Sequence, residues 1–176
     1  KKLLLSFLLF RFPFVHYGNE FKVDGIYYNI TSDSTVEVTY LSLYSGNYSG
    51  NIIVPETVSY NNKTYTIKEI GDNAFEQCAN LISITLPNSL TSIGEFAFVS
   101  CKSLSRIVFP NSITSIGEYA FGSCTSLDSL YIPENVKEIA IGTFSFCTNL
   151  HYITLPDSLT RIGSDAFYEC SSLNSI

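Results

Sequence analysis

A repeat of 23 residues runs from residue 70 to the end of the chain. Cysteine, phenylalanine, leucine and proline each recur at this interval. The cysteine column is Cys78, Cys101, Cys124, Cys147 and Cys170, and the phenylalanine column is Phe75, Phe98, Phe121, Phe144 and Phe167. Four columns in register establish a repeat, and a repeat decides the fold class before any local pattern does.

Each 23-residue unit predicts one coil of a solenoid. The segment 81–86 has alternating apolar residues at its end and stops at Pro87, so we expect a short strand. The segment 90–93 predicts a second extended piece, and Gly94 permits a tight corner into a single helical or 3₁₀ turn at 95–100. Coils stacked about 4.8 Å apart would pair strand with strand and bury the repeated side chains.

One unit departs from the pattern at its corner. Ala140 stands where the other units have Gly71, Gly94, Gly117 and Gly163. We expect the turn to be strained or altered there.

Residues 19–69 predict a cap. Asp24-Gly25 indicates a two-residue hairpin, the segment 35–41 alternates like a strand, and 52–55 is expected to form the strand of an irregular first coil. A second hairpin is expected around 60–63. A terminal unit of this kind covers the apolar edge of the first coil. The expected organisation is therefore a cap at 19–69 and five repeats at 70–176, the last incomplete.

Residues 1–18 have the pattern of a secretory signal peptide. Lys1 and Lys2 precede the apolar run 3–10, which is too short to span a bilayer, so we predict export and no transmembrane span. The alternative is a buried first strand, because Arg11 interrupts the apolar segment. The chain has no methionine, so we interpret it as a fragment of a longer protein. It stops within a coil and without a polar closing unit, so we expect the natural protein to continue beyond Ile176.

Composition and spacing exclude several functions. Ten basic residues against sixteen acidic ones give a net charge of -6, which opposes nucleic-acid binding. Two histidines are too few for a dense histidine site, and cysteines 23 residues apart lack the short spacing of a zinc site. No phosphate loop or nucleophile elbow is present, and His151 is not placed as a base. We predict no metal, no cofactor and no enzymatic activity.

Two further columns have a structural and a chemical interpretation. The five cysteines could support redox chemistry, but parallel inward side chains are poorly aimed for disulfides, so a buried, reduced cysteine ladder is favoured. The acidic column Asp72, Glu95 and Glu118 could bind a cation. Its favoured role is to cap the helical turns that follow.

The remaining candidate site is the outward face of the first strand in each unit. Residues that flank the inward isoleucine or leucine should point to solvent and form columns across the sheet. These are Ser83, Thr85, Arg106, Val108, Ser129, Tyr131, Tyr152 and Thr154. Arginine and tyrosine often dominate protein interfaces, so Arg106, Tyr131 and Tyr152 are the candidate contacts. The alternative is an ordinary solvated sheet face.

The unit Ile93-Gly94-Glu95-Phe96-Ala97-Phe98, followed by Cys101 and Leu104, resembles the BspA-like class of leucine-rich repeat proteins, named for a Bacteroides surface antigen. The resemblance covers 70–176, and 21–30 looks like the leader region ahead of such repeats. It implies a leucine-rich-repeat solenoid, mostly β with short turns, at the cell surface or outside the cell. It also implies adhesion, with proteins or glycans of the extracellular matrix or of other cells as partners. The alternative role is a spacer array that presents another module.

Overall fold

The structure is a computed structural model that describes residues 20–40, 46 and 48–174. The predicted signal peptide lies outside these residues. Within them the chain forms fourteen strands and no α- or 3₁₀-helix. The strands are β1 (Glu20–Val23), β2 (Ile26–Ile30), β3 (Thr35–Thr39), β4 (Gly50–Ile53), β5 (Thr57–Tyr60), β6 (Lys63–Ile70), β7 (Leu81–Thr85), β8 (Ser92–Ile93), β9 (Arg106–Ile107), β10 (Ser115–Ile116), β11 (Ser129–Tyr131), β12 (Glu138–Ile139), β13 (Tyr152–Thr154) and β14 (Arg161–Ile162).

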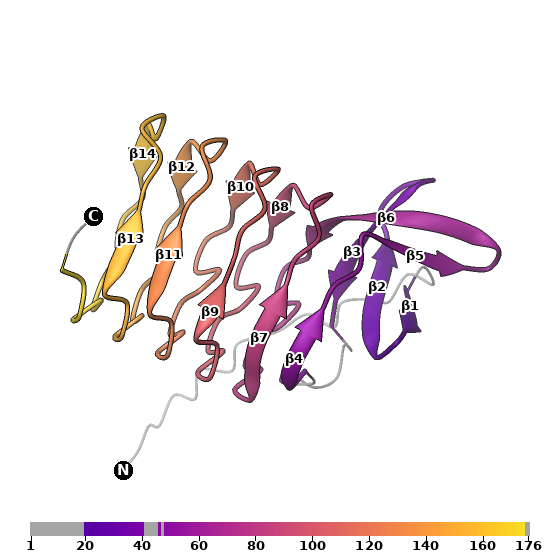
Figure 1. The fold of residues 1–176 in the computed structure, drawn as a ribbon, viewed down its shortest axis with the longest axis horizontal. Helices are drawn as coiled ribbons and strands as arrows, with labels where there is room; N and C mark the ends of the chain where they lie inside the picture. Colours follow the sequence, from indigo (N-terminus) through magenta and orange to yellow (C-terminus); the bar gives the residue numbers. More distant parts are fainter. Residues whose placement is uncertain (1–19, 41–45, 47, 175–176) are drawn as a thin grey trace, which may run out of the picture.

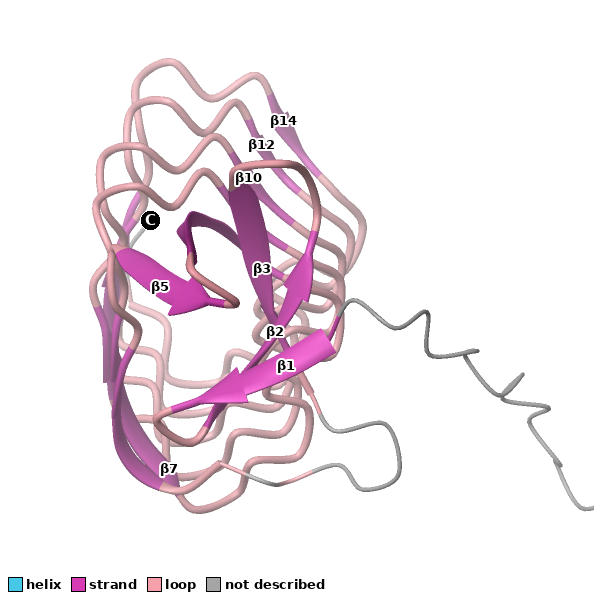
Figure 2. Cartoon of the chain, turned by 90° about the vertical axis from the view of Figure 1, so that its right-hand side faces the viewer, coloured by secondary structure: helices cyan, strands magenta, loops and turns pink. Residues whose placement is uncertain are grey.

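The amino-terminal strands form the cap. β1 and β2 make an antiparallel hairpin in which Val23 pairs with Ile26, and Asp24 and Gly25 both have positive φ, as a two-residue hairpin turn requires. The hairpin at Tyr60 and Lys63 joins β5 to β6 in the same way. Both predicted hairpins are therefore confirmed. Figure 2 shows β1, β2, β3 and β5 lying across one end of the stack of coils.

A buried tyrosine ties the cap to the first coil. The Tyr48 hydroxyl donates to the carbonyl oxygen of Thr39 at 2.8 Å and accepts the N–H of Tyr27 at 3.0 Å. Its ring lies 4.6 Å from the ring of Phe75, centroid to centroid. Burial raises the pKa of this hydroxyl well above its ordinary value, so it stays a donor at physiological pH.

The coils stack as parallel strands on two sides of a solenoid (Figure 1). On one side β4 pairs with β7 and β7 with β9, and β11 pairs with β13. On the other side β6, β8 and β10 form a ladder, and β12 pairs with β14. The strand predicted at 52–55 is observed as β4, which begins two residues earlier and ends at Ile53, and the strand ending before Pro87 is confirmed as β7.

The core between these sides consists of columns of the repeated residues. Phe75, Phe98, Phe121 and Phe144 are fully buried, and successive rings stack with centroids 4.9, 5.0 and 5.7 Å apart. Burying one such ring contributes about 1.5–3 kcal/mol relative to leaving it exposed. Each coil thus completes its core only against its neighbours, as expected for a solenoid.

The third side of each coil is not the helical turn that the sequence predicted. It is a run of turns in which successive backbone N–H groups donate alternately to a carbonyl of the next coil and to a carbonyl of their own coil. The N–H of Phe75 donates to the carbonyl of Ala97 in the next coil at 2.7 Å, whereas the N–H of Ala74 donates to Gly71 of its own coil at 3.2 Å. This geometry needs two residues of positive φ in each coil. In successive coils they are Asn73 and Gln77, Phe96 and Ser100, Tyr119 and Ser123, Gly142 and Phe146, and Asp165 and Glu169.

The corner glycines serve close packing, so the expectation that Gly94 supplies conformational freedom is wrong. Gly94 and Gly117 are not among the residues of positive φ. A Cβ atom at Gly117 would lie 2.6 Å from the backbone nitrogen of Glu95 in the preceding coil. The spacing between coils at this corner therefore leaves no room for a side chain.

Both parallel sheets are interrupted at one position along the stack. Within the described residues no ladder joins β9 to β11 or β10 to β12. The interruption lies between the coils 104–126 and 127–149, and we call this interface the seam. The turn side remains continuous across the seam, where the N–H of Phe121 donates to the carbonyl of Thr143 at 2.8 Å.

The seam coincides with Ala140, where the sequence predicted an altered turn. Gly117 and Gly163 each donate their N–H to an isoleucine carbonyl of the preceding coil, at 2.9 and 2.7 Å. In the described part of the chain Ala140 makes no such bond to Ile116. The altered coil is therefore observed, and its effect is on pairing between coils.

Candidate functional site

The outward residues of five stacked strands form two parallel rows, which we call the strand face. One row is Asn51, Ser83, Arg106, Ser129 and Tyr152, and the other is Ile53, Thr85, Val108, Tyr131 and Thr154. The register within each paired sheet places these residues side by side, because parallel strands align equivalent positions of successive coils.

The exposed fractions fit an outward orientation. Val108, Tyr131 and Tyr152 are 63%, 53% and 58% exposed, whereas the intervening Ile107 and Leu130 are buried. Ser83 is half-buried because its hydroxyl donates to the side-chain oxygen of Asn51 at 2.7 Å.

Two residues of the strand face were missed by the sequence analysis. Asn51 and Ile53 lie on β4, which pairs in parallel with β7, and Ile53 is 71% exposed. The signal was present: Val54-Pro55 ends this strand as Leu86-Pro87 ends β7. Pro55 and Pro87 are further apart than the 23 residues of the repeat, so the repeat pattern alone does not align the two strands.

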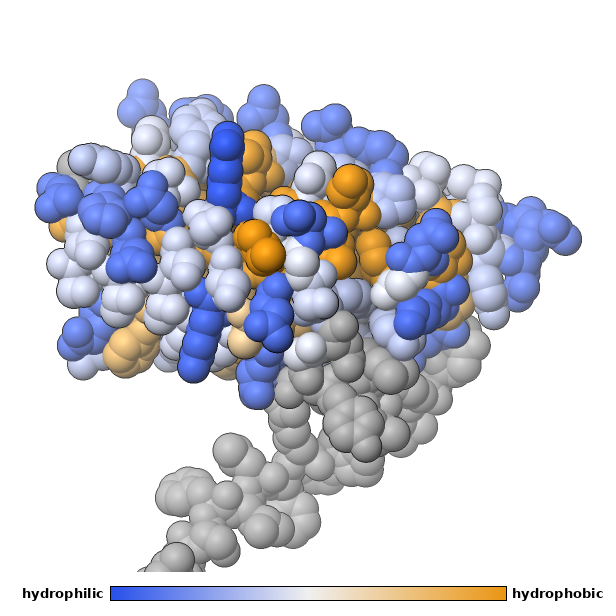
Figure 3. All heavy atoms as spheres, turned by 60° about the horizontal axis from the view of Figure 1, so that its bottom comes forward, coloured by the Kyte–Doolittle hydropathy of each residue, from blue (hydrophilic) through white to orange (hydrophobic). Residues whose placement is uncertain are grey.

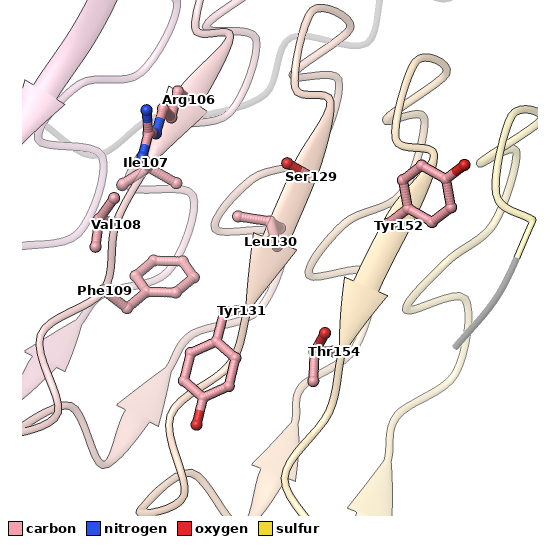
Figure 4. A pocket seen from close by; sticks show the side chains of 9 residues that line it. All are labelled: Arg106, Ile107, Val108, Phe109, Ser129, Leu130, Tyr131, Tyr152 and Thr154. Atoms are coloured by element: carbon pink, nitrogen blue, oxygen red, sulfur yellow. The ribbon is translucent and has the colours of Figure 1, made fainter.

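Six of the eight predicted residues line a hollow at the seam. The hollow has a volume of about 300 Å³ and extends over β9, β11 and β13, and so across the seam. Figure 4 shows Arg106, Ser129 and Tyr152 along one row and Val108, Tyr131 and Thr154 along the other, with the ring of Phe109 directed toward β11. Ser83 and Thr85 lie on β7 and are not part of it. We call this feature the seam hollow.

Arg106 carries the only charge in the two rows of the strand face. No ion pair or hydrogen bond of its guanidinium is found within the described residues. The nearby Asp128 carboxylate is instead held by the Nδ1 atom of His151 at 2.9 Å. Ser105, Asp128 and His151 occupy one column with the aspartate in the middle, so His151 is two coils away from the serine and cannot act as its base.

The surface beside the strand face is mixed in polarity. Figure 3 shows hydrophobic groups separated by hydrophilic ones on the side that it views. Large exposed apolar residues include Ile53 and Val108 on the strand face itself and Ile82 next to it. Protein interfaces that form and dissociate have about the same mixed polarity as the rest of a protein surface, so this composition is compatible with binding but does not single out the site.

The cysteine column lies inside the solenoid. Cys78, Cys101, Cys124 and Cys147 are buried and Cys170 is half-buried, and all five are free thiols. Each thiol from Cys101 onward donates to the carbonyl oxygen of a phenylalanine in the preceding coil, at 3.1 to 3.2 Å. Burial raises the pKa of Cys147 to about 12 and raises that of Cys124 well above its ordinary value, so these thiols are protonated.

The acidic column has no helix to cap, and that expectation is corrected. The carboxylate of Asp72 accepts the N–H of Glu95 in the next coil at 2.7 Å, so it links two coils. Among the described residues no group of three metal-ligating side chains is close enough to hold a metal ion. The same part of the chain has no helix that is long and apolar enough to cross a membrane.

The 23-residue coil identifies a family. The model of the BspA type leucine rich repeat region, present in six copies, matches residues 68–176, which is more than half of the sequence. The chain belongs to the BspA-type leucine-rich repeat family. A comparison with curated proteins finds no match.

Solved structures of leucine-rich repeat proteins share this fold. A leucine rich cell surface protein from Faecalibacterium prausnitzii is 28% identical with a TM-score of 0.66, and the alignment covers 89% of this chain and 54% of that one. A leucine-rich repeat protein from Bacteroides capillosus is 27% identical with a TM-score of 0.60, covering 82% and 98%. The pneumococcal vaccine antigen PcpA, 21% identical with a TM-score of 0.62 over 86% and 48%, shares the fold. The chain thus spans about half the length of the first of these proteins.

Proposed function

We propose that this chain is a non-enzymatic binding protein of the cell surface or extracellular space, and that it attaches to proteins or glycans of the extracellular matrix or of other cells. The observation that carries the proposal is the strand face, two rows of mostly exposed side chains that run along the paired strands on both sides of the seam. The likeness of the chain to the F. prausnitzii cell surface protein supports a location at the cell surface.

The chemistry of the strand face suits recognition. Arg106, Tyr131 and Tyr152 are exposed on elements that are fixed by parallel pairing, so they lose little conformational freedom on binding. Tyrosine and arginine contribute a large share of the binding energy in many protein interfaces. The predicted signal peptide at 1–18 supports export, and the proposed role needs no cofactor.

The test is a binding assay with the purified chain on surfaces coated with an extracellular-matrix extract and on cultured epithelial cells. We expect saturable binding that falls at least tenfold in the triple variant R106A/Y131A/Y152A. The matched control is R161A/Y168A, which removes the same residue types from other sides of the solenoid, where Arg161 pairs with Glu138 and Tyr168 is 51% exposed.

The outcome distinguishes the binding role from the spacer role. Equal binding by the wild type and by the triple variant would overturn the proposed strand-face site and favour a solenoid that spaces another module. Circular dichroism of both variants checks that the coils remain folded.

A further inference from the structure

Two side chains of the coil 127–149 are larger than the residues at the equivalent positions of the other coils. Ala140 replaces a glycine, and Thr143 occupies the column of Ala74, Ala97, Ala120 and Ala166. The fully buried Thr143 donates its hydroxyl to the carbonyl of Ala140 at 2.9 Å. Ala140 lies at the corner, and Thr143 lies next to it on the turn side, where its carbonyl accepts the N–H of Phe121 across the seam at 2.8 Å and its hydroxyl lies 3.5 Å from the carbonyl oxygen of Gly117.

The added atoms explain why the seam opens on the strand sides. At the equivalent glycines a Cβ atom would lie 2.6 Å from backbone atoms of the preceding coil, closer than real Cβ contacts allow. Hydrogen bonds hold the coil 127–149 against the preceding coil on the turn side, while the added side-chain atoms push the two coils apart at the adjacent corner. Such a coil tilts away from the preceding coil on its two strand sides. The loss of pairing between β9 and β11 and between β10 and β12 fits this tilt.

The seam hollow combines one cation with polar and apolar groups. Arg106 stands at its rim with no ion pair in the described structure, and Val108 and Phe109 supply apolar walls. Tyr131 and Tyr152 also line the hollow, and in Figure 4 their hydroxyl groups point outward from it. A guanidinium presents its N–H groups as a planar fork that matches a carboxylate.

We propose that the seam hollow binds a carboxylate-bearing side chain of a peptide segment in the partner protein, and that Ala140 and Thr143 are positioning residues that hold the hollow open. The inference rests on the proposed function of the strand face. Charge complementarity favours this occupant, because Arg106 is the single charge in the two rows of the strand face. The net charge of -6 opposes an acidic partner at long range, but salt screens that repulsion beyond about 8 Å.

The test uses a fluorescein-labelled octapeptide of alternating Glu and Val and its counterpart with Gln in place of Glu. We expect the Glu peptide to bind at least tenfold more tightly and to shift the NMR resonances of residues 106–109 and 129–131. R106Q should abolish the difference between the two peptides. R161Q, which removes an exposed arginine from β14, should leave it unchanged.

The double variant A140G/T143A tests the seam itself. It restores the residues that the other coils carry, so we expect slower amide exchange at residues 137 and 140 and at least tenfold weaker binding of the Glu peptide. Unchanged peptide affinity after the exchange has slowed would overturn the positioning role of these residues.

The remaining outcomes separate this inference from the proposed function. Matrix binding that depends on Arg106, Tyr131 and Tyr152, without a preference for the Glu peptide over the Gln peptide, would overturn the carboxylate site and leave the strand-face function standing. Preference for a glucuronic acid oligosaccharide over the Glu peptide would overturn the peptide assignment. Loss of matrix binding in R161A/Y168A but not in R106A/Y131A/Y152A would overturn both.

Discussion

Glycine at the corner of each coil controls how closely the coils approach. At Gly117 the nearest atoms to an added Cβ belong to the backbone of the preceding coil, and backbone atoms cannot move aside as the end of a side chain can. At the seam, where Ala140 stands in place of this glycine, no strand pairing is found among the described residues. The absence of pairing at the coil that carries a methyl group at this corner fits the close-packing role of the glycine.

Replacing Gly117 with alanine should lower the free energy of unfolding by about 1–3 kcal/mol, the usual cost of overpacking. The matched control is Gly122→Ala, since a Cβ at Gly122 meets its nearest atom at an ordinary 3.4 Å. Urea denaturation of both variants measures the difference. Equal stability of G117A and G122A would contradict the close-packing role.

The cysteines should react with iodoacetamide only slowly in the folded protein. Burial raises the pKa of the thiols at Cys101, Cys124 and Cys147, and only the thiolate is a good nucleophile. Cys170 is half-buried and should be labelled first. Mass spectrometry with and without denaturant gives the extent at each site, and rapid native labelling at two or more of the buried positions would show that the column is accessible.

Strands and turns contribute differently to the stack. The strands pair by the period-2 pattern that the sequence displays, and proline marks where they end. The turn side depends on residues such as Asn73 and Phe96 in the left-handed region, which is unfavourable for an isolated non-glycine residue. Hydrogen bonds to the next coil offset that cost, so local propensity misled the expectation of a helical turn.

Amide exchange should map the seam. The N–H groups of Thr114 and Thr160 donate to the preceding coil at 2.9 Å, whereas in the described chain Lys137, the equivalent residue at the seam, makes no such bond. We therefore expect Lys137 and Ala140 to exchange at least tenfold faster than Thr114 and Gly117. Native-state exchange followed by NMR makes the comparison, and similar protection at all four amides would mean that the coils pair continuously.

The whole molecule joins an antiparallel cap to a parallel stack, and carboxylates gather at that junction. Glu37 on β3 is paired in register with Glu69 on β6, and Asp72 follows closely. Burial raises the pKa of Glu37, the nearby Asp72 and Glu20 raise it further, and a hydrogen bond from Asn29 at 2.7 Å partly opposes this. Burial and the charges of Glu37 and Asp72 likewise raise the pKa of Glu69.

The junction should make the protein less stable as pH rises above the ordinary glutamate range. Between the unfolded and the raised folded pKa the native state binds more protons than the unfolded chain, so the free energy of unfolding falls with increasing pH. At lower pH both states are protonated and this penalty is absent. Glu37→Gln should flatten this dependence, and Glu169→Gln, at an exposed site, should not. Denaturation curves from pH 4 to 8 provide the measurement; a slope unchanged by E37Q would exclude Glu37 as its source.

The sequence by itself determined the solenoid, the inward columns, both hairpins of the cap and the outward residues of the strands, because a 23-residue period and alternating strands place each side chain without reference to distant contacts. Only the tertiary structure decided how the turn side folds, why its corners need glycine, and where the coils part. These features depend on hydrogen bonds and close contacts between successive coils. The same holds for the seam hollow: Arg106 and Tyr131 could be assigned to one face from the sequence, but only the structure shows that they line one hollow at a place where two coils lack strand pairing.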